Sequence, residues 1–109
     1  MSTRCNIHFA YSTDEPPEAN IYRHSDGYPE GEEFFTEVEA QTTDTRFNDP
    51  SYLAAKFVVW QAGQFAKHGS GQPLDFLSLG VTNKDAGDGE YVYTVICGNG
   101  RPEVIHREA

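Results

Sequence analysis

The sequence contains no long apolar run and few cysteines. None of its apolar stretches approaches the roughly 18 residues that a membrane-spanning helix needs, and the polar start MSTRCN lacks the apolar centre of a secretory signal. The two cysteines, Cys5 and Cys97, form no CxxC pair, and each lies within an apparent strand. We therefore expect a cytoplasmic protein whose cysteines are reduced core residues.

The sequence also lacks the short motifs of the commonest enzymes and metal sites. It has no GxxxxGK[ST] phosphate loop, no GxGxxG after a strand, no GxSxG elbow and no HExxH pair. The acidic loop from Asn83 to Glu90 lacks the ligand spacing of a calcium loop, and we expect a solvated hairpin there. These absences favour a non-enzymatic protein without cofactor or metal. The alternative is a zinc site in which His8 meets His24 or His106 across paired strands.

Basic residues are scarce, and the acidic excess is concentrated in one part of the chain. The protein has 17 Asp and Glu against 8 Lys and Arg, a formal net charge of -9. Between Asp14 and Asp49 there are 11 acids but only Arg23 and Arg46 as bases, whereas the rest of the chain carries six of each sign. Such a surface repels phosphate groups, because nucleic-acid affinity comes largely from cations that displace counterions. We expect no direct binding to nucleic acid and none to membranes.

The length of 109 residues and the hydrophobic content of 38% suit one domain, residues 1–109, with a single core. From Cys5 to Tyr11 the odd-numbered residues form an apolar face, which predicts a half-buried strand. A second strand, Ile21 to His24, follows the proline-containing loop STDEPPEAN. We expect these two strands to pair as a hairpin.

Two helices are predicted next. Residues Glu30 to Gln41 follow the helical period, with phenylalanines and valine on one stripe and glutamates elsewhere. Asp49 is suited to an N-cap, Pro50 to the first helical position and Gly69 to the stop of a helix of about five turns. The apolar stripe of this second helix is broad, so we expect it to be the core helix.

The remaining chain returns to the period of strands. Strands are predicted at Leu77–Val81, Tyr91–Cys97 and Val104–His106, and the GDG and GNG sequences at 87–89 and 98–100 predict hairpin turns. The predicted order is therefore β-β-α-α-β-β-β. Hairpins at both ends favour an α+β domain with a largely antiparallel sheet and two helices packed on one face.

The segment Tyr22–Pro29, YRHSDGYP, brings several reactive side chains together at the end of a strand. In a catalytic interpretation, His24 is a general base oriented by Asp26, with Arg23 stabilising an anion and Tyr28 beside them. In the structural interpretation, which we favour, the carboxylate bonds the turn backbone, the glycine supplies a positive φ and the proline directs the chain into the next helix.

The opening Ser2-Thr3-Arg4, the first strand and above all Ile21–Gly31, IYRHSDGYPEG, resemble a group of small phage, prophage and mobile-element proteins. The stretches Asp49–Trp60 and Glu90–Val95 are similar too, so the likeness covers most of the chain. The group has no established catalytic residues to carry over. Small acidic phage proteins of this size often block a host defence complex, and several anti-CRISPR proteins present carboxylates to a basic nucleic-acid channel. The resemblance implies a location, the host bacterial cytoplasm, and no chemistry.

Charge and resemblance together favour a non-enzymatic inhibitor, such as an anti-CRISPR protein, that docks on the basic nucleic-acid-binding surface of a CRISPR effector. One alternative is a small hydrolase or transferase centred on the 22–29 turn. Another is a structural or assembly module of phage origin that forms a homodimer through a sheet edge. The candidate partner-binding residues are acids of the first forty positions: Asp14, Glu15, Glu18, Glu30, Glu32, Glu33, Glu37 and Glu39.

Overall fold

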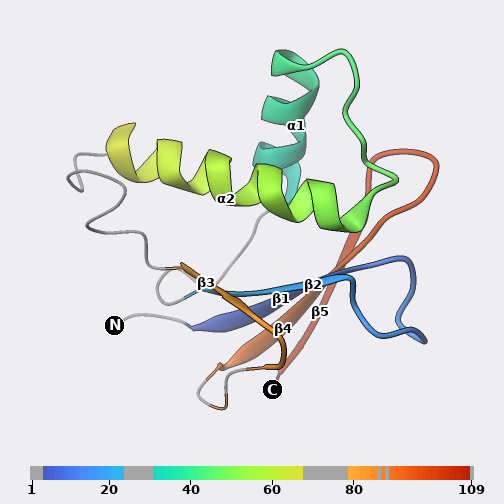
Figure 1. The fold of residues 1–109 in the computed structure, drawn as a ribbon, viewed down its shortest axis with the longest axis vertical. Coiled ribbons are helices and arrows are strands. Elements are labelled where there is room, and N and C mark those ends of the chain that lie inside the picture. Colours follow the sequence, from blue (N-terminus) through green and yellow to red (C-terminus); the bar gives the residue numbers. More distant parts are fainter. Residues whose placement is uncertain (1–3, 24–30, 68–78, 86, 88, 109) are drawn as a thin grey trace.

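Two helices lie on one side of a five-stranded sheet in the computed structural model, which describes residues 4–23, 31–67, 79–85, 87 and 89–108 (Figure 1). This arrangement confirms the predicted α+β class and the predicted order of elements. None of the described helices is long and apolar enough to cross a membrane. The elements are β1 (Cys5–Ala10), β2 (Ala19–Arg23), α1 (Gly31–Gln41), α2 (Pro50–Lys67), β3 (Leu79–Thr82), β4 (Tyr91–Ile96) and β5 (Glu103–Glu108).

The strands are arranged in the order β3-β2-β1-β4-β5. The prediction of a largely antiparallel sheet is confirmed, and the exception is the parallel pairing of β1 with β4 at its centre. In this register Ile7 of β1 lies opposite Ile21 of β2 on one side and Tyr93 of β4 on the other. The predicted hairpins β1–β2 and β4–β5 are both present, the second closed by the GNG sequence.

The prediction that the GDG sequence at 87–89 closes a hairpin is wrong. β3 pairs with β2, where Val81 lies opposite Ile21, and β4 pairs with β1 and β5. The connection 83–90, predicted as a solvated hairpin, therefore joins two strands that are separated by β2 and β1. The reason is that glycine residues determine only the local turn geometry, whereas strand pairing depends on contacts between distant segments, such as those that place β1 between β2 and β4.

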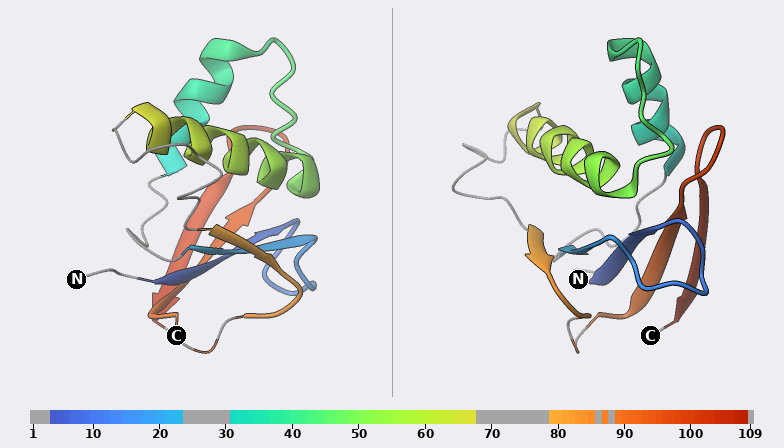
Figure 2. Two further views of the ribbon diagram at one scale, coloured as in Figure 1. Left: turned by 60° about the vertical axis from the view of Figure 1, so that its left-hand side comes forward. Right: turned by 45° about the vertical axis from the view of Figure 1, so that its right-hand side comes forward.

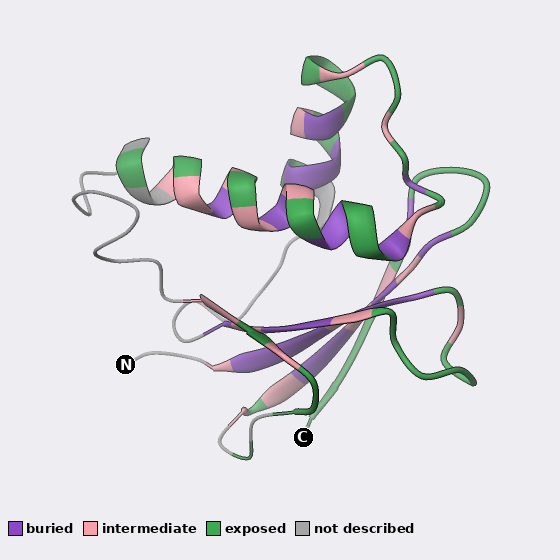
Figure 3. Ribbon diagram, in the orientation of Figure 1, coloured by how far each residue is buried: buried purple, intermediate pink, exposed green. Residues whose placement is uncertain are grey.

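The core lies between the helices and one face of the sheet (Figure 3). The ring of Phe57, in the middle of α2, packs 5.9 Å from that of Phe9 in β1 and 5.3 Å from that of Phe34 in α1. Phe35 of α1 packs edge-on against Phe47, with 5.5 Å between ring centroids. Burying each such side chain contributes roughly 1.5–3 kcal/mol, so these aromatic contacts join the sheet and both helices into one unit.

The first strand is one residue shorter than predicted. Tyr11, expected on the apolar face, is 49% exposed and lies in the loop that joins β1 to β2. The loop starts one residue earlier than predicted because of two backbone hydrogen bonds. The N–H of Glu18 donates to the carbonyl of Phe9 at 2.9 Å, and the N–H of Cys97 donates to the carbonyl of Ala10 at 2.9 Å. The carbonyl of Ala10 is thus satisfied by the chain beyond β4 rather than by β2.

Neither α1 nor α2 covers the second face of the sheet, and the β1–β2 loop bends toward that face (Figure 2). Asn6, His8 and Ala10 of β1 point to this face, because side chains alternate along a strand. Asn6 and Ala10 are nevertheless 1% exposed. The β1–β2 loop and the connection 83–90 supply cover at this face, as the pocket beside Ala10 and the contact of Asp85 with His8 show.

We predict that Asp49→Ala lowers the free energy of unfolding by about 1 kcal/mol, because Asp49 caps α2. Its Oδ1 accepts a hydrogen bond from the backbone N–H of Tyr52 at 3.2 Å, and its carbonyl oxygen accepts one from the backbone N–H of Leu53 at 2.9 Å. Asp49→Asn keeps an N-cap acceptor and should retain most of the stability. Urea denaturation measures both variants, and equal losses in the two would contradict the capping explanation.

Candidate functional site

The helical layer carries part of the predicted partner-binding set on α1. Glu33 and Glu39 are exposed and Glu37 is half-buried, and the sequence of α1 contains no Lys or Arg. Arg101, from the β4–β5 connection, donates to the carboxylate of Glu39. Glu37 accepts a hydrogen bond from Gln41 at 3.0 Å, and neither Glu33 nor Glu37 pairs with a cation of the described residues. α1 thus presents two carboxylates that no cation in the described part of the chain neutralises.

The remaining described members of the set lie in the β1–β2 loop and are exposed: Asp14, Glu15 and Glu18. Glu15 lines a pocket together with His8 and Thr94, whose side chains point away from the helices. The loop acids and the acids of α1 are therefore on different sides of the sheet (Figure 1). The two groups cannot form one flat acidic surface.

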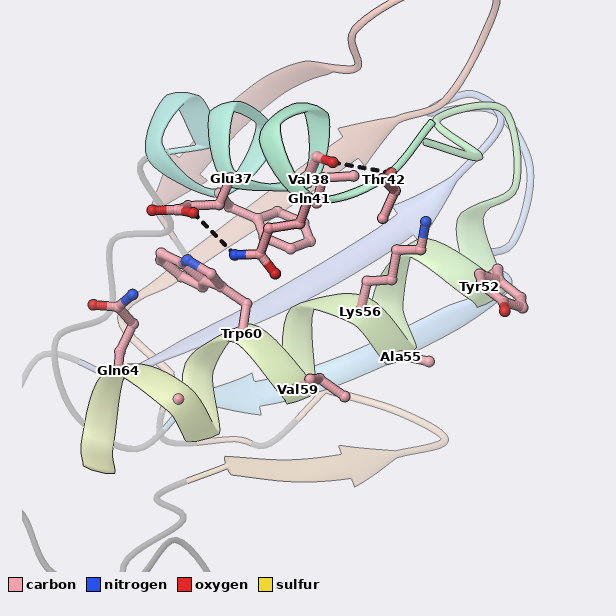
Figure 4. A pocket seen from close by; sticks show the side chains of 12 residues that line it. Glu37, Val38, Gln41, Thr42, Tyr52, Ala55, Lys56, Val59, Trp60 and Gln64 are labelled. Atoms are coloured by element: carbon pink, nitrogen blue, oxygen red, sulfur yellow. Dashed lines mark hydrogen bonds between the residues drawn. The ribbon is translucent and has the colours of Figure 1, made fainter. Parts of the chain in front are cut away.

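A groove of about 680 Å³ runs between α1 and α2 (Figure 4). Phe34 and Val38 of α1 and the half-buried Trp60 of α2 give it an apolar lining. The side chains of Glu37 and Gln41 form its α1 side and are hydrogen-bonded to each other. The groove therefore combines an apolar interior with a carboxylate at its edge.

The groove also has cations beside its apolar lining: Lys56 of α2 lines it, and Arg46 of the connection between the helices lies against Tyr52, another lining residue. Lys56 Nζ donates to the carbonyls of Asp44 and Thr45, at 3.2 and 3.1 Å. The guanidinium of Arg46 lies over the ring of Tyr52, 4.4 Å from its centroid, and its Nε is 3.3 Å from a carboxylate oxygen of Asp44. Both cations therefore bind oxygen atoms of the connection, and neither pairs with Glu33 or Glu37.

Of the four candidate catalytic residues, Arg23 lies in the described part of the chain. Arg23 is 8% exposed and points toward the helices, since it lies opposite the buried Cys5 in the register of β1 and β2. Several predicted site residues lie outside the described part of the chain: His24, Asp26, Tyr28, Glu30 and the side chain of Glu32. The catalytic arrangement of Arg23, His24, Asp26 and Tyr28 therefore stays a prediction.

A cluster that the sequence analysis missed lies on the sheet face away from the helices. His8 Nε2 and Asn20 Nδ2 both donate to the same oxygen of Asp85, at 2.6 and 2.9 Å. His8 and Asn20 are opposite each other in the register of β1 and β2, and Asp85 comes from the connection 83–90. Burial raises the pKa of Asp85, but these two hydrogen bonds and the nearby charges of His8 and Arg107 bring that pKa below its ordinary value of 3.8.

A pocket of about 390 Å³ adjoins this cluster and is lined by His8, Thr94, Arg107 and Glu15. A histidine held by a carboxylate is an arrangement that general bases use. Here, however, the carboxylate also accepts from Asn20, and it belongs to the segment that crosses this face of the sheet. We interpret the cluster as the contact that holds the connection 83–90 against the sheet. The polar residues at even positions of β1 are the one sequence signal for it.

The described residues contain no group of three His, Cys, Asp or Glu side chains that could hold a metal ion. His106 stacks on Tyr93, with 5.4 Å between ring centroids, and Tyr93 belongs to the core on the helix side. The imidazole of His8 points to the opposite face. A zinc site shared by His8 and His106 therefore has no support in the described structure.

Cys5 and Cys97 are free and buried. Burial raises the pKa of both thiols to about 11, Arg23 lowering that of Cys5 in part and the negative charge of Asp49 raising that of Cys97 further. A nucleophilic cysteine needs the opposite shift, toward the thiolate. Neither cysteine is therefore suited to covalent catalysis.

Comparisons with known proteins give no further assignment. No protein-family model matches the chain, and no match is found among curated proteins or among solved structures. The function must be inferred from charge, burial and geometry alone.

We predict that Asp85→Asn destabilises the protein at neutral pH and that the difference from the original protein disappears in acid. A carboxyl whose pKa is lowered by folding stabilises the folded state above its unfolded pKa, here 3.8, and loses that effect as the pH falls through its folded pKa. Thermal melting of both proteins between pH 7 and strongly acidic pH measures the difference. A difference that does not change with pH would contradict the charged contact.

We also predict that neither cysteine of the folded protein reacts quickly with a thiol reagent at pH 8. With a pKa of about 11, roughly one thiol in a thousand is ionised at that pH, and both are buried as well. Titration with Ellman's reagent should find no rapidly reacting thiol in buffer and both in guanidinium chloride. A rapidly labelled cysteine in the native protein would contradict this prediction.

Proposed function

We propose that the protein is a non-enzymatic inhibitor that binds a basic surface of a host defence complex through the acids of α1. A CRISPR effector, whose guide and target strands occupy a Lys- and Arg-rich channel, is the partner class that fits this charge. The observation that supports the proposal is that Glu33 and Glu37, on a helix whose sequence has no Lys or Arg, have no cationic partner among the described residues. Carboxylates in such a position attract a basic partner and repel nucleic acid.

The proposal assigns the docking to α1 and not to the β1–β2 loop. The two acidic groups are on different sides of the sheet, so a single basic surface contacts one of them at a time. α1 is joined to the core through Phe34 and Phe35, which are 3% and 1% exposed, and its acids are therefore displayed on a rigid helix. Rigid display limits the entropy lost on binding.

Among the described residues, no specific observation favours an enzyme over a binding protein. Both thiols are buried with raised pKa values, and the carboxylate beside His8 accepts two hydrogen bonds within the fold. A binding role needs only the exposed acids and the rigid layer beneath them.

The test measures inhibition of guide-directed DNA binding by a panel of purified CRISPR effector complexes. We expect the protein to inhibit one of them, with an inhibitory concentration that rises steeply with salt. Changing Glu32, Glu33 and Glu37 to Lys should raise that concentration at least about a hundredfold, because like charges across an interface cost several kcal/mol.

The control is a matched reversal of the loop acids, Asp14, Glu15 and Glu18 to Lys, which makes the same change in net charge on the other side of the sheet. This control should inhibit far better than the α1 variant. Equal loss in both variants would show that net charge, and not α1, matters. Failure of every effector to be inhibited, or inhibition that is insensitive to salt and to both reversals, would overturn the proposal.

A further inference from the structure

α2 presents an exposed apolar stripe on its outer face. Tyr52, Ala55, Val59 and Gly63 are spaced three or four residues apart, which places them on one side of the helix, and all four are exposed. Val59 is 73% exposed and Tyr52 is 46% exposed, whereas Phe57, on the other side of the helix, is 2% exposed. Exposed valine and tyrosine side chains in line along a helix are typical of an interaction surface.

The stripe is continuous with the groove between the helices (Figure 4). All four of its residues line that groove, together with the apolar side chains of α1 and with Trp60. A Cβ at Gly63 would meet no atom within 4 Å, so this end of the groove is open. From residue 52 to residue 63 the stripe is about 17 Å long, which matches roughly three turns of a second helix lying along it.

The charged side chains at the groove indicate which kind of partner it binds. Glu37 lines the α1 side of the groove, Glu33 lies on the same helix, and neither has a cationic partner among the described residues. Lys56 of α2 also lines the groove, but its ammonium group donates to the carbonyls of Asp44 and Thr45. A second copy of this chain would bring the same glutamates and a further net charge of -9 to the contact. Like charges oppose that pairing, whereas Lys and Arg beside an apolar face would be attracted.

We propose that the groove between α1 and α2 binds an amphipathic helix rich in Lys and Arg, whose apolar face packs on Val59 and Tyr52 and whose cations face Glu33 and Glu37. This inference rests on the proposed function, because it names the element of the basic partner that the acids of α1 would meet. The apolar contact supplies the buried area, and the glutamates select a basic sequence.

Trp60 makes the proposal directly measurable. It is the single tryptophan of the chain, it is half-buried, and it lines the groove. The probe is a synthetic peptide of about 18 residues, or five turns, with Leu on one helical face, Lys on the other and no aromatic residue. The control peptide has the same composition in an order that spreads Leu around the helix. Titration of the full chain with the first peptide should shift the emission of Trp60, and the control peptide should bind far more weakly.

The decisive variant is Val59→Glu, because it adds a negative charge while removing an apolar contact. If charge alone held the peptide, this variant would bind at least as tightly as the original protein. We expect instead a loss of at least about tenfold in affinity, from the lost apolar burial. Val81→Glu is the matched control, since Val81 is 78% exposed on β3 and does not line the groove. Both valines are exposed, so circular dichroism and thermal melting should show both variants folded, and Ala55→Glu provides a second groove variant.

Equal affinity of the Val59→Glu and Val81→Glu proteins for the peptide, or equal binding of the two peptides, would overturn the inference. The same two variants separate it from the proposed function. If the Val59→Glu and Val81→Glu proteins inhibit an effector equally well, the proposed docking through α1 is retained, but the groove does not contact that effector. If no effector is inhibited, the proposed function fails, and the peptide titration judges the groove alone.

Discussion

The parallel pairing of β1 with β4 is the constraint on which the rest of the structure depends. Parallel neighbours cannot be joined by a tight turn, so the chain between them must cross from one end of the sheet to the other. Here that chain forms β2, α1, α2 and β3, and both helices lie on the same face. β1 is paired on both sides, and Cys5, Ile7 and Phe9 are at most 1% exposed. The apolar side chains of the central strand therefore lie in the middle of the core.

The helices divide the sheet into two faces with different chemistry. On the covered face, Phe57 contacts Phe9 and Phe34, and one aromatic cluster joins the sheet to both helices. On the other face, where Ala10 and Val92 are also buried, hydrogen bonds from His8 and Asn20 hold Asp85. The acidic residues follow the same division, because α1 belongs to the helical layer and the β1–β2 loop bends toward the other side.

The proposed binding mode follows from the way the helical layer is built. α1 projects carboxylates that its own sequence does not neutralise, and α2 leaves Val59 exposed and Tyr52 partly exposed in the groove between the helices. Long-range charge attraction speeds association with a basic partner, while apolar contact in the groove slows dissociation. Lys56 lines the groove and Arg46 lies over Tyr52, but both bind oxygen atoms of the connection between the helices, so Glu33 and Glu37 remain available to the partner's cations.

Local features of the sequence determined most of the secondary structure. The cap at Asp49, the helical period of α1 and α2, the alternation in β1 and the GNG turn all act within a few residues, so the class and the order of elements could be predicted. The acidic excess could also be predicted from the sequence, because net charge depends on composition alone. Tertiary structure alone decided that β3 pairs with β2 and not with β4, since the central position of β1 between β2 and β4 is set by contacts between distant segments. It also brought His8 to Asp85 and separated the loop acids from those of α1, because contacts between distant residues exist only once the strands have paired.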